Sequence, residues 1–427
     1  MKKIISIVFL LQSLFLQAQD FNLKNEAIEQ FKNENYPLAI HLMERAKKEN
    51  PTDAEIYYYL GFFSHYLAND SRPLVGYDYQ MSERIFAYLD KAIELNPKYG
   101  NAKYFYGAEC SSNAFKAMQN YDSESLRKIY GKAFDIGAYP EWLLEFGRNM
   151  LANCGKNALL FTGGNADFDV CMYLQLHENY RTDISIMPIG NIDRPWYVKY
   201  IKEGIIPGFR KVNIELTDAQ IYDMHPYKWD TTIVSIPVSE ELILRYGLSA
   251  SAEMEWEIFP DLSSDRNHSK IRGEKIQKRT YLSPQRAILL HIIESNKWER
   301  PICFSNMANP FFWGGLDAFF QNCGLVSRLM PFKTHETKWE TDYHKLELWL
   351  SSENDFSDYC SVLEEDIPRI SGLLNSYHIA VINLLEHYKN SGDKESLKKI
   401  LRIYHKKLSI GKFPDIERYI SSRFGIN

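Results

Sequence analysis

The sequence predicts an α/β plus all-α chain: tetratricopeptide-like helical repeats, a Rossmann-like parallel α/β domain and C-terminal helical hairpins. Two similar strings, Ala46–Pro51 and Ala92–Pro97, indicate the repeats. After Ala158, apolar runs typical of strands alternate with helix-like segments, a pattern that favours a parallel sheet covered by helices. Helical periodicity returns after about Leu346. We therefore expect a signal peptide at 1–18, helical repeats at 22–154, an α/β domain at 157–335 and a helical, repeat-like region at 340–427.

The first residues indicate export. Met1–Lys3 carries two lysines, Ile4–Leu16 is mostly apolar, and Ala18 supplies a small residue before Gln19. This order is that of a secretory signal peptide, and the apolar run is too short to span a bilayer. A buried N-terminal helix is the alternative. We expect export to the periplasm or the outer cell surface, with no transmembrane segment in the mature chain.

The composition limits the classes of protein to which the chain can belong. Hydrophobic residues make up 45% and charged residues 25% of 427 residues, as in ordinary folded domains. The net charge of −5 is too small to indicate a nucleic-acid partner. The six cysteines are dispersed and form no CxxC pair, so buried free thiols are favoured over disulfides and metal binding.

Helix packing explains the prolines and glycines of the repeats. Each string ends in a proline, and a glycine, Gly61 or Gly107, follows ten residues later. Small residues let helices approach closely, and proline closes the second helix of a pair. The copies are 46 residues apart instead of the usual ~34, which we attribute to an insertion around Asn69–Pro73. A generic helical bundle is the alternative, and a protein or peptide is the partner expected on the repeats.

The α/β region is defined by short alternating segments. Leu282-Ser283-Pro284 is a good helix start, because serine caps and proline fits the first turn. Strands are expected at Ala158–Phe161, Ile184–Ile189, Ile233–Ile236 and Pro301–Phe304. Helices are expected at Asp169–His177, Trp196–Lys202, Ser239–Tyr246 and Ser283–Glu294, and a final hairpin at Tyr377–Lys389 and Lys394–His405.

The turn Thr162–Asp169 follows the first strand, where open α/β sheets bind ligands. Its acids suit a sugar or a cation better than a phosphate. The alternative is that Asn165 caps the next helix while Asp167 and Asp169 stabilise its first turn. Arg181-Thr182-Asp183 and Arg300-Pro301 are interpreted as ion-paired junctions that fix strands. The candidate ligand-binding residues are Gly163, Gly164, Asn165, Asp167, Asp169, Arg181, Asp183 and Trp196.

Three blocks, in order, carry a family resemblance: Thr162–Asp169 (TGGNADFD), Trp298–Phe304 (WERPICF) and Gly324–Pro331 (GLVSRLMP). Together they resemble the soluble C-terminal region of multi-spanning envelope proteins related to protein O-mannosyltransferases, over about residues 157–427. The family's turn resembles G-D-N-D-T-F-P, and Gly163–Asp169 lacks one of its acids. The membrane-spanning half that handles the lipid-linked sugar has no counterpart here. The resemblance therefore implies a relative of the accessory domain and not a transferase.

No catalytic motif, metal site or cofactor is predicted. The eleven histidines form no metal-binding group, His335-Glu336 lacks the second histidine of HExxH, and no G-x-S-x-G string occurs. The basic stretch Arg266–Arg279 is interpreted as a solvated loop. We expect a non-catalytic, protein-binding scaffold of the cell envelope. The alternative is a glycan-binding or glycan-active protein, which would require Asp167, Arg181 and Trp196 to converge above Gly163-Gly164.

Overall fold

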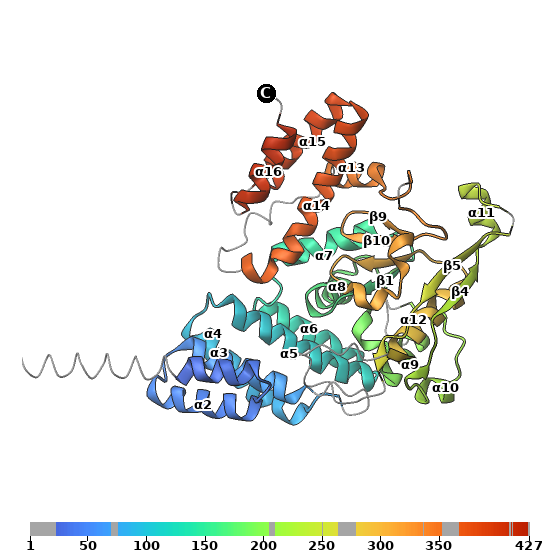
Figure 1. Cartoon of the computed structure of the whole chain (residues 1–427). Coiled ribbons are helices and arrows are strands. Elements are labelled where there is room, and N and C mark those ends of the chain that lie inside the picture. Colours follow the sequence, from blue (N-terminus) through green and yellow to red (C-terminus); the bar gives the residue numbers. More distant parts are fainter. Residues whose placement is uncertain are drawn as a thin grey trace, which may run out of the picture. The chain divides into compact units, whose positions relative to one another are not determined.

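The computed structural model describes residues 23–69, 76–204, 210–249, 251–263, 279–335, 337–351, 367–409, 411 and 413–425. The expected signal peptide, most of the insertion at Asn69–Pro73 and most of the basic stretch Arg266–Arg279 lie outside these residues. Within them the chain is mixed α/β, with many helices and a mixed sheet (Figure 1). No helix in this described part is long and apolar enough to span a membrane.

The chain forms two compact units. The described residues up to Ala117, with Glu124–Tyr139, make the first, and Met118–Ser123 with the residues from Pro140 onward make the second. The helices before the boundary at 139–140 are residues 23–32, α2 (Tyr36–Glu49), α3 (Ala54–Ala68), η1 (Tyr79–Met81), α4 (Ser82–Leu95), α5 (Gly100–Gln119) and α6 (Ser123–Asp135).

The first unit is built from helices whose small residues lie inside. Ala39, Met43 and Ala46 of α2 are buried, as is Gly61 of α3. A Cβ added at Gly61 would lie 2.8 Å from the Leu89 side chain of α4, and one at Gly107 would lie 2.9 Å from the Cβ of Ala138. The expected close approach of two helices is therefore present at Gly61, whereas Gly107 meets Ala138 in the turn after α6.

The second unit begins with α7 (Glu141–Asn153), a helix that the sequence assigned to the helical region at 22–154. Its Gly147 packs against Val170 and Leu174 of α8 (Asn165–Glu178). The remaining helices are η2 (Ile189–Asn191), α9 (Pro195–Glu203), α10 (Asp218–Tyr222), α11 (Glu240–Tyr246), α12 (Pro284–Ser295), η3 (Pro310–Trp313), η4 (Leu316–Phe319), α13 (Tyr343–Ser351), α14 (Ile367–Ser391), α15 (Lys394–Lys407) and α16 (Pro414–Phe424).

The central sheet has five strands in the order β2-β1-β8-β10-β9. Its strands are β1 (Leu159–Thr162), β2 (Ser185–Pro188), β8 (Ile302–Ser305), β9 (Phe320–Asn322) and β10 (Val326–Leu329). The strands β2, β1 and β8 are parallel, as expected, and are buried along their whole length. Burial on both faces explains why they read as continuous apolar runs. However, β10 pairs in the antiparallel direction with both β8 and β9, so the sheet is mixed and the expected parallel pairing is limited to β2, β1 and β8.

The fourth expected strand, Ile233–Ile236, does not join this sheet. It lies in β4 (Thr232–Pro237), which pairs only with the antiparallel β5 (Glu253–Ile258) within the described residues. In Figure 1 these two strands form an arm that carries α11 at its end. A further small sheet has the order β3-β7-β6, from β3 (Tyr227–Lys228), β6 (Leu262–Ser263) and β7 (Arg279–Leu282).

The local helix signals agree with the structure. Ser283 is the N-cap of α12 and accepts a hydrogen bond from the Arg286 amide, and Pro284 occupies the first turn. At the C-terminus, α14 and α15 form the expected hairpin around Gly392, whose φ of +75° suits glycine. The five cysteines in the described residues are free and buried, and Cys360 lies outside them.

Candidate functional site

The turn between β1 and α8 was the leading candidate for a ligand site. Asp167 lies in the first turn of α8 and is 1% exposed. Its carboxylate accepts hydrogen bonds from the amides of Gly163 (2.8 Å) and Gly164 (2.9 Å). Burial raises the pKa of Asp167, and hydrogen bonds from the Gly163 amide, the Ser305 hydroxyl and the Gly164 amide oppose that rise. These contacts account for the acid without a ligand.

The structure shifts the cap of α8 by one residue. Gly164 is the N-cap, and Asn165 is the exposed first residue of the helix, so the interpretation of Asn165 as the cap is wrong. Asp167, which was assigned only a dipole effect, closes the turn from the third helical position. Asp169 is 2% exposed and faces the interior. A Cβ on Gly163 would lie 2.4 Å from the carbonyl oxygen of Met307, so the chain passes too close for any larger residue.

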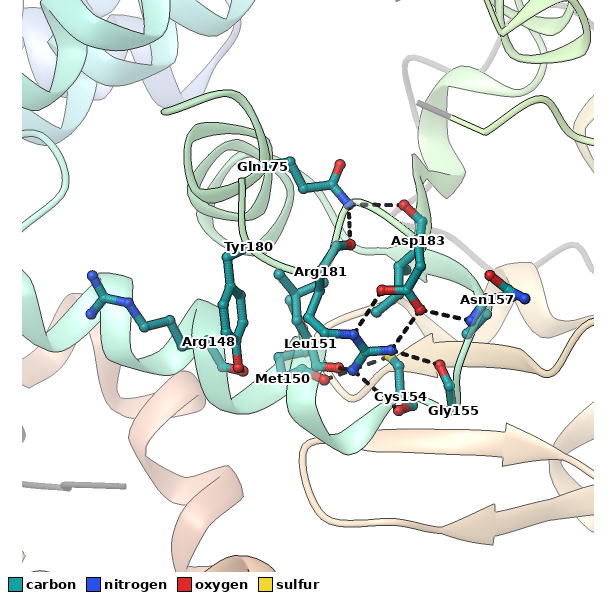
Figure 2. Close-up of polar contacts among 12 residues, drawn as sticks. Arg148, Met150, Leu151, Cys154, Gly155, Asn157, Gln175, Tyr180, Arg181 and Asp183 are labelled. Carbon is teal, nitrogen blue, oxygen red and sulfur yellow. Dashed lines mark hydrogen bonds and ion pairs between the residues drawn. The ribbon is translucent and has the colours of Figure 1, made fainter. Parts of the chain in front are cut away.

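Arg181 and Asp183 form a clamp before β2 (Figure 2). The Arg181 guanidinium donates to both oxygens of Asp183 and also to the carbonyls of Leu151 and Gly155. Asp183 accepts from the amide of Asn157, just before β1. The Arg181 hydrogen bonds lower the pKa of Asp183 to about 2. The pair therefore ties the end of α7 to the starts of β1 and β2.

The candidate residues do not converge. Gly163, Gly164 and Asp167 lie beyond the carboxyl end of β1, whereas Arg181 and Asp183 lie at its amino end. Four strand residues separate these edges, or ~13 Å. Trp196 follows β2 on α9, where it is half-buried and packs edge-to-face on Tyr197. No group of three potential metal-ligating side chains occurs among the residues that the structure describes.

Arg300 stabilises the amino edge of the central sheet through hydrogen bonds to neutral acceptors and not through the expected ion pair. Its guanidinium donates to the carbonyls of Asn157 (2.6 Å) and Ala158 (3.1 Å) and to the hydroxyl of Ser185 (2.8 Å). Burial and the nearby Arg210 lower its pKa to about 10. Arg300 thus fixes the starts of β1, β2 and β8 through neutral acceptors.

A buried polar cluster inside the first unit was not anticipated. Glu109 of α5 is fully buried and accepts hydrogen bonds from Tyr77, from Ser82 (2.5 Å) and from Asn113 (3.1 Å). His65 Nδ1 lies 2.9 Å from the same carboxylate. The lone pairs of Glu109 are occupied, so the cluster joins α3, α4 and α5.

Aromatic side chains also gather in the first unit. Tyr66 of α3 is 41% exposed, and Phe31 and Phe62 are half-buried. The ring of Phe31 meets Tyr66 edge-on at 5.1 Å, and Phe62 lies 4.9 Å from Tyr66. Phe62 also meets Phe105 of α5 at 4.5 Å. We call Phe31, Tyr36, Phe62, Tyr66 and Phe105 the aromatic ladder, because their rings contact one another across the helix at 23–32, α2, α3 and α5.

Residues 143–226 and 234–348 match the family model of TMEM260-associated domain 2. The matched segments contain the β1–α8 turn and the two later blocks, Trp298–Phe304 and Gly324–Pro331. TMEM260 proteins are similar to protein O-mannosyltransferases, so the match agrees in broad terms with the resemblance seen in the sequence. Neither a curated protein nor a solved structure matches the chain.

Proposed function

We propose that this chain is an exported, non-catalytic scaffold protein of the cell envelope, which binds a peptide segment of a partner protein. The aromatic ladder is the observation that carries the proposal. The helices of the first unit would pair as tetratricopeptide-like repeats, and the second unit would contain a Rossmann-like part. Its location would be the periplasm or the outer cell surface.

The chemistry of the ladder defines the class of peptide. Its members are phenylalanines and tyrosines, so its rings offer apolar faces and its tyrosines offer hydroxyl groups without a formal charge. Leu67, which follows Tyr66 in α3, is an apolar side chain that is 40% exposed. Proline and aromatic side chains pack well against such faces, and an extended peptide loses little entropy when it binds. We therefore propose a partner segment rich in proline or aromatic residues.

The contacts at the predicted α/β crevice favour this function over the glycan alternative at Gly163–Asp169. Asp167, Arg181 and Asp183 are occupied by internal hydrogen bonds. A ligand at this turn would have to break the contacts that hold α8 and β2 in place.

Selection from a random peptide library tests the proposal. The full chain is used as bait, and the affinity of each selected peptide is measured by calorimetry. We expect proline- or aromatic-rich peptides that bind Tyr66→Ala at least ~10-fold more weakly, because removing a central aromatic residue from an interface often costs about 2 kcal/mol. Tyr419→Ala on α16 is the matched control, since Tyr419 is 46% exposed. Peptides that bind both variants equally well, or a selection that yields none, would refute the proposal.

A further inference from the structure

A cavity of about 400 Å³ lies beside the outer edge of the central sheet. It is bounded by β9, which is the edge strand, by β10, and by residues of α13 and α14. It is formed by segments far apart in the chain, since Phe320 and Asn383 both line it. The cavity is separate from the aromatic ladder and belongs entirely to the second unit.

The register places this cavity toward the carboxyl edge of the parallel strands. Ser327 of β10 pairs with Phe304 of β8 on one side and with Asn322 of β9 on the other. Phe304 in turn pairs with Phe161, the residue before the last one of β1. Open α/β sheets bind ligands at this edge. The cavity thus lies near the edge that the sequence indicated, but three strands away from β1.

The polar groups that line the cavity include four neutral side chains that can donate and accept hydrogen bonds. Asn322 and Asn383 contribute amides, and Ser327 and Thr341 contribute hydroxyls. Thr341 is only 7% exposed, and the side chains of Thr341 and Asn383 have no hydrogen-bond partner within the described ranges. Amides and hydroxyls both donate and accept, so they match the hydroxyl groups of a ligand.

Two carboxylates, Glu340 and Glu386, complete the polar lining. Glu340 lies 2.9 Å from His335, and Glu386 pairs with Arg423 of α16. Lysine, arginine and histidine are missing from the lining residues, so a phosphate or carboxylate would meet repulsion without a counter-charge. A metal ion would find only two acids in the lining, each already in contact with a side chain outside it.

Two rings give the cavity an apolar wall. Phe320 is nearly buried, and Tyr343 is half-buried. Tyr343 stacks on His387 with 3.7 Å between ring centroids, which fixes the position of its ring. Ligands that combine hydroxyl groups with C–H faces use such a wall together with neutral hydrogen-bonding groups.

We propose that this cavity binds a neutral carbohydrate of one or two sugar units. The amides, hydroxyls and carboxylates would hold the sugar hydroxyls, and Tyr343 would contact its C–H face. The volume of about 400 Å³ is within the usual range of ligand pockets. The proposal is independent of the peptide partner, because the two sites lie in different units.

Saturation-transfer NMR on the full chain tests it. The probes are the methyl glycosides of glucose, galactose, mannose and N-acetylglucosamine, the disaccharides maltose and cellobiose, and methyl glucuronide as the charged comparison. We expect at least one neutral probe to receive saturation from the protein and to bind more tightly than the glucuronide. No transfer to any neutral probe, or stronger binding of the glucuronide, would overturn the proposal.

One variant and two controls locate the site. Asn383→Ala should weaken binding of the neutral probe about five-fold, the effect of losing a hydrogen bond to a neutral ligand. Asn390→Ala, at an exposed position on the same helix, should leave it unchanged. Tyr66→Ala should also leave it unchanged, which separates this site from the peptide site. Equal binding by Asn383→Ala and the unmodified chain would place the sugar elsewhere and refute the assignment.

Discussion

Arg181 and Asp183 meet side by side, with Nε–Oδ1 at 2.8 Å and Nη2–Oδ2 at 3.0 Å. Arg181 has a left-handed backbone, φ +47°, which is unfavourable for a residue other than glycine. The hydrogen bonds of its guanidinium offset this unfavourable backbone conformation, because they join the end of α7 to Asp183, just before β2. The pair, which the sequence favoured as an ion-paired junction over a ligand contact, thus holds the β-α-β unit together.

Replacing Arg181 should destabilise the fold. In Arg181→Leu, Asp183 and the carbonyls of Leu151 and Gly155 lose their donor in a mostly buried place. We expect the free energy of unfolding to fall by about 2–4 kcal/mol in urea denaturation. Arg148→Leu is the control, because Arg148 makes surface pairs with Glu141 and Glu178 and should cost less than about 1 kcal/mol. Equal losses in both variants would contradict the clamp.

The same pair predicts a loss of stability in acid. The pKa of Asp183 is about 2 in the folded chain, while an unfolded aspartate titrates near ~3.9. The ionised Asp183 therefore stabilises the folded state in full above pH ~4. This contribution to the free energy of unfolding disappears as the pH falls through about 2. Asp183→Asn should lower the free energy of unfolding by about 1–2 kcal/mol at pH 6, and the difference from the unmodified chain should shrink toward pH 2. A difference that stays constant with pH would be inconsistent with this assignment.

The hydrogen bonds that cap α8 predict which of two substitutions costs more stability. Asp167→Asn keeps one hydrogen-bond acceptor, but its NH₂ group then faces a backbone N–H, so two donors meet. We expect the free energy of unfolding to fall by about 1–3 kcal/mol. Asn165→Ala changes an exposed first-turn residue and should cost less than about 0.5 kcal/mol. Chemical denaturation of both variants measures the order. A larger loss for Asn165→Ala would restore the cap that the sequence suggested.

Close packing at Gly107 predicts intolerance to size. A Cβ there would already lie 2.9 Å from the Cβ of Ala138, so Gly107→Leu should cost about 1–3 kcal/mol or more and lower the thermal midpoint. Gly190→Ala is the control, because nothing lies within 4 Å of an added Cβ and its backbone is not left-handed. Calorimetric scans of both variants should separate them clearly. Equal midpoints would show that α5 and the residues after α6 can move apart.

The buried cluster around Glu109 should be sensitive to loss of its acceptor. Glu109→Leu removes the acceptor that Tyr77, Ser82 and Asn113 share in a buried place, which should cost about 2–4 kcal/mol. Glu124→Leu on α6 is the control, since its pair with Lys128 is exposed and should contribute less than about 0.5 kcal/mol. Urea denaturation compares the two. A small effect at Glu109 would mean that water replaces the carboxylate.

Part of the candidate sites could be predicted and part could not. The sequence indicated the carboxyl edge of the parallel strands, and the β1–α8 turn does lie there. It did not indicate the cavity, because Ser327, Asn383 and Glu386 carry no shared motif and meet only through strand pairing and helix packing. The alternation of Glu253–Ile258, whose residues are exposed and buried in turn, was a readable strand signal that was missed.

Signals that act within a few residues were enough to predict local elements. The cap at Ser283 and Pro284, the turn at Gly392 and the apolar run of β1 depend on hydrogen bonds and burial along a short stretch of chain. Partners distant in sequence decided the rest. Only the tertiary structure showed that β4 pairs with β5, that β10 runs antiparallel to β8, and that Ser305 hydrogen-bonds to Asp167. The physical reason is that strand pairing and buried hydrogen bonds join groups whose distance along the chain leaves no local pattern.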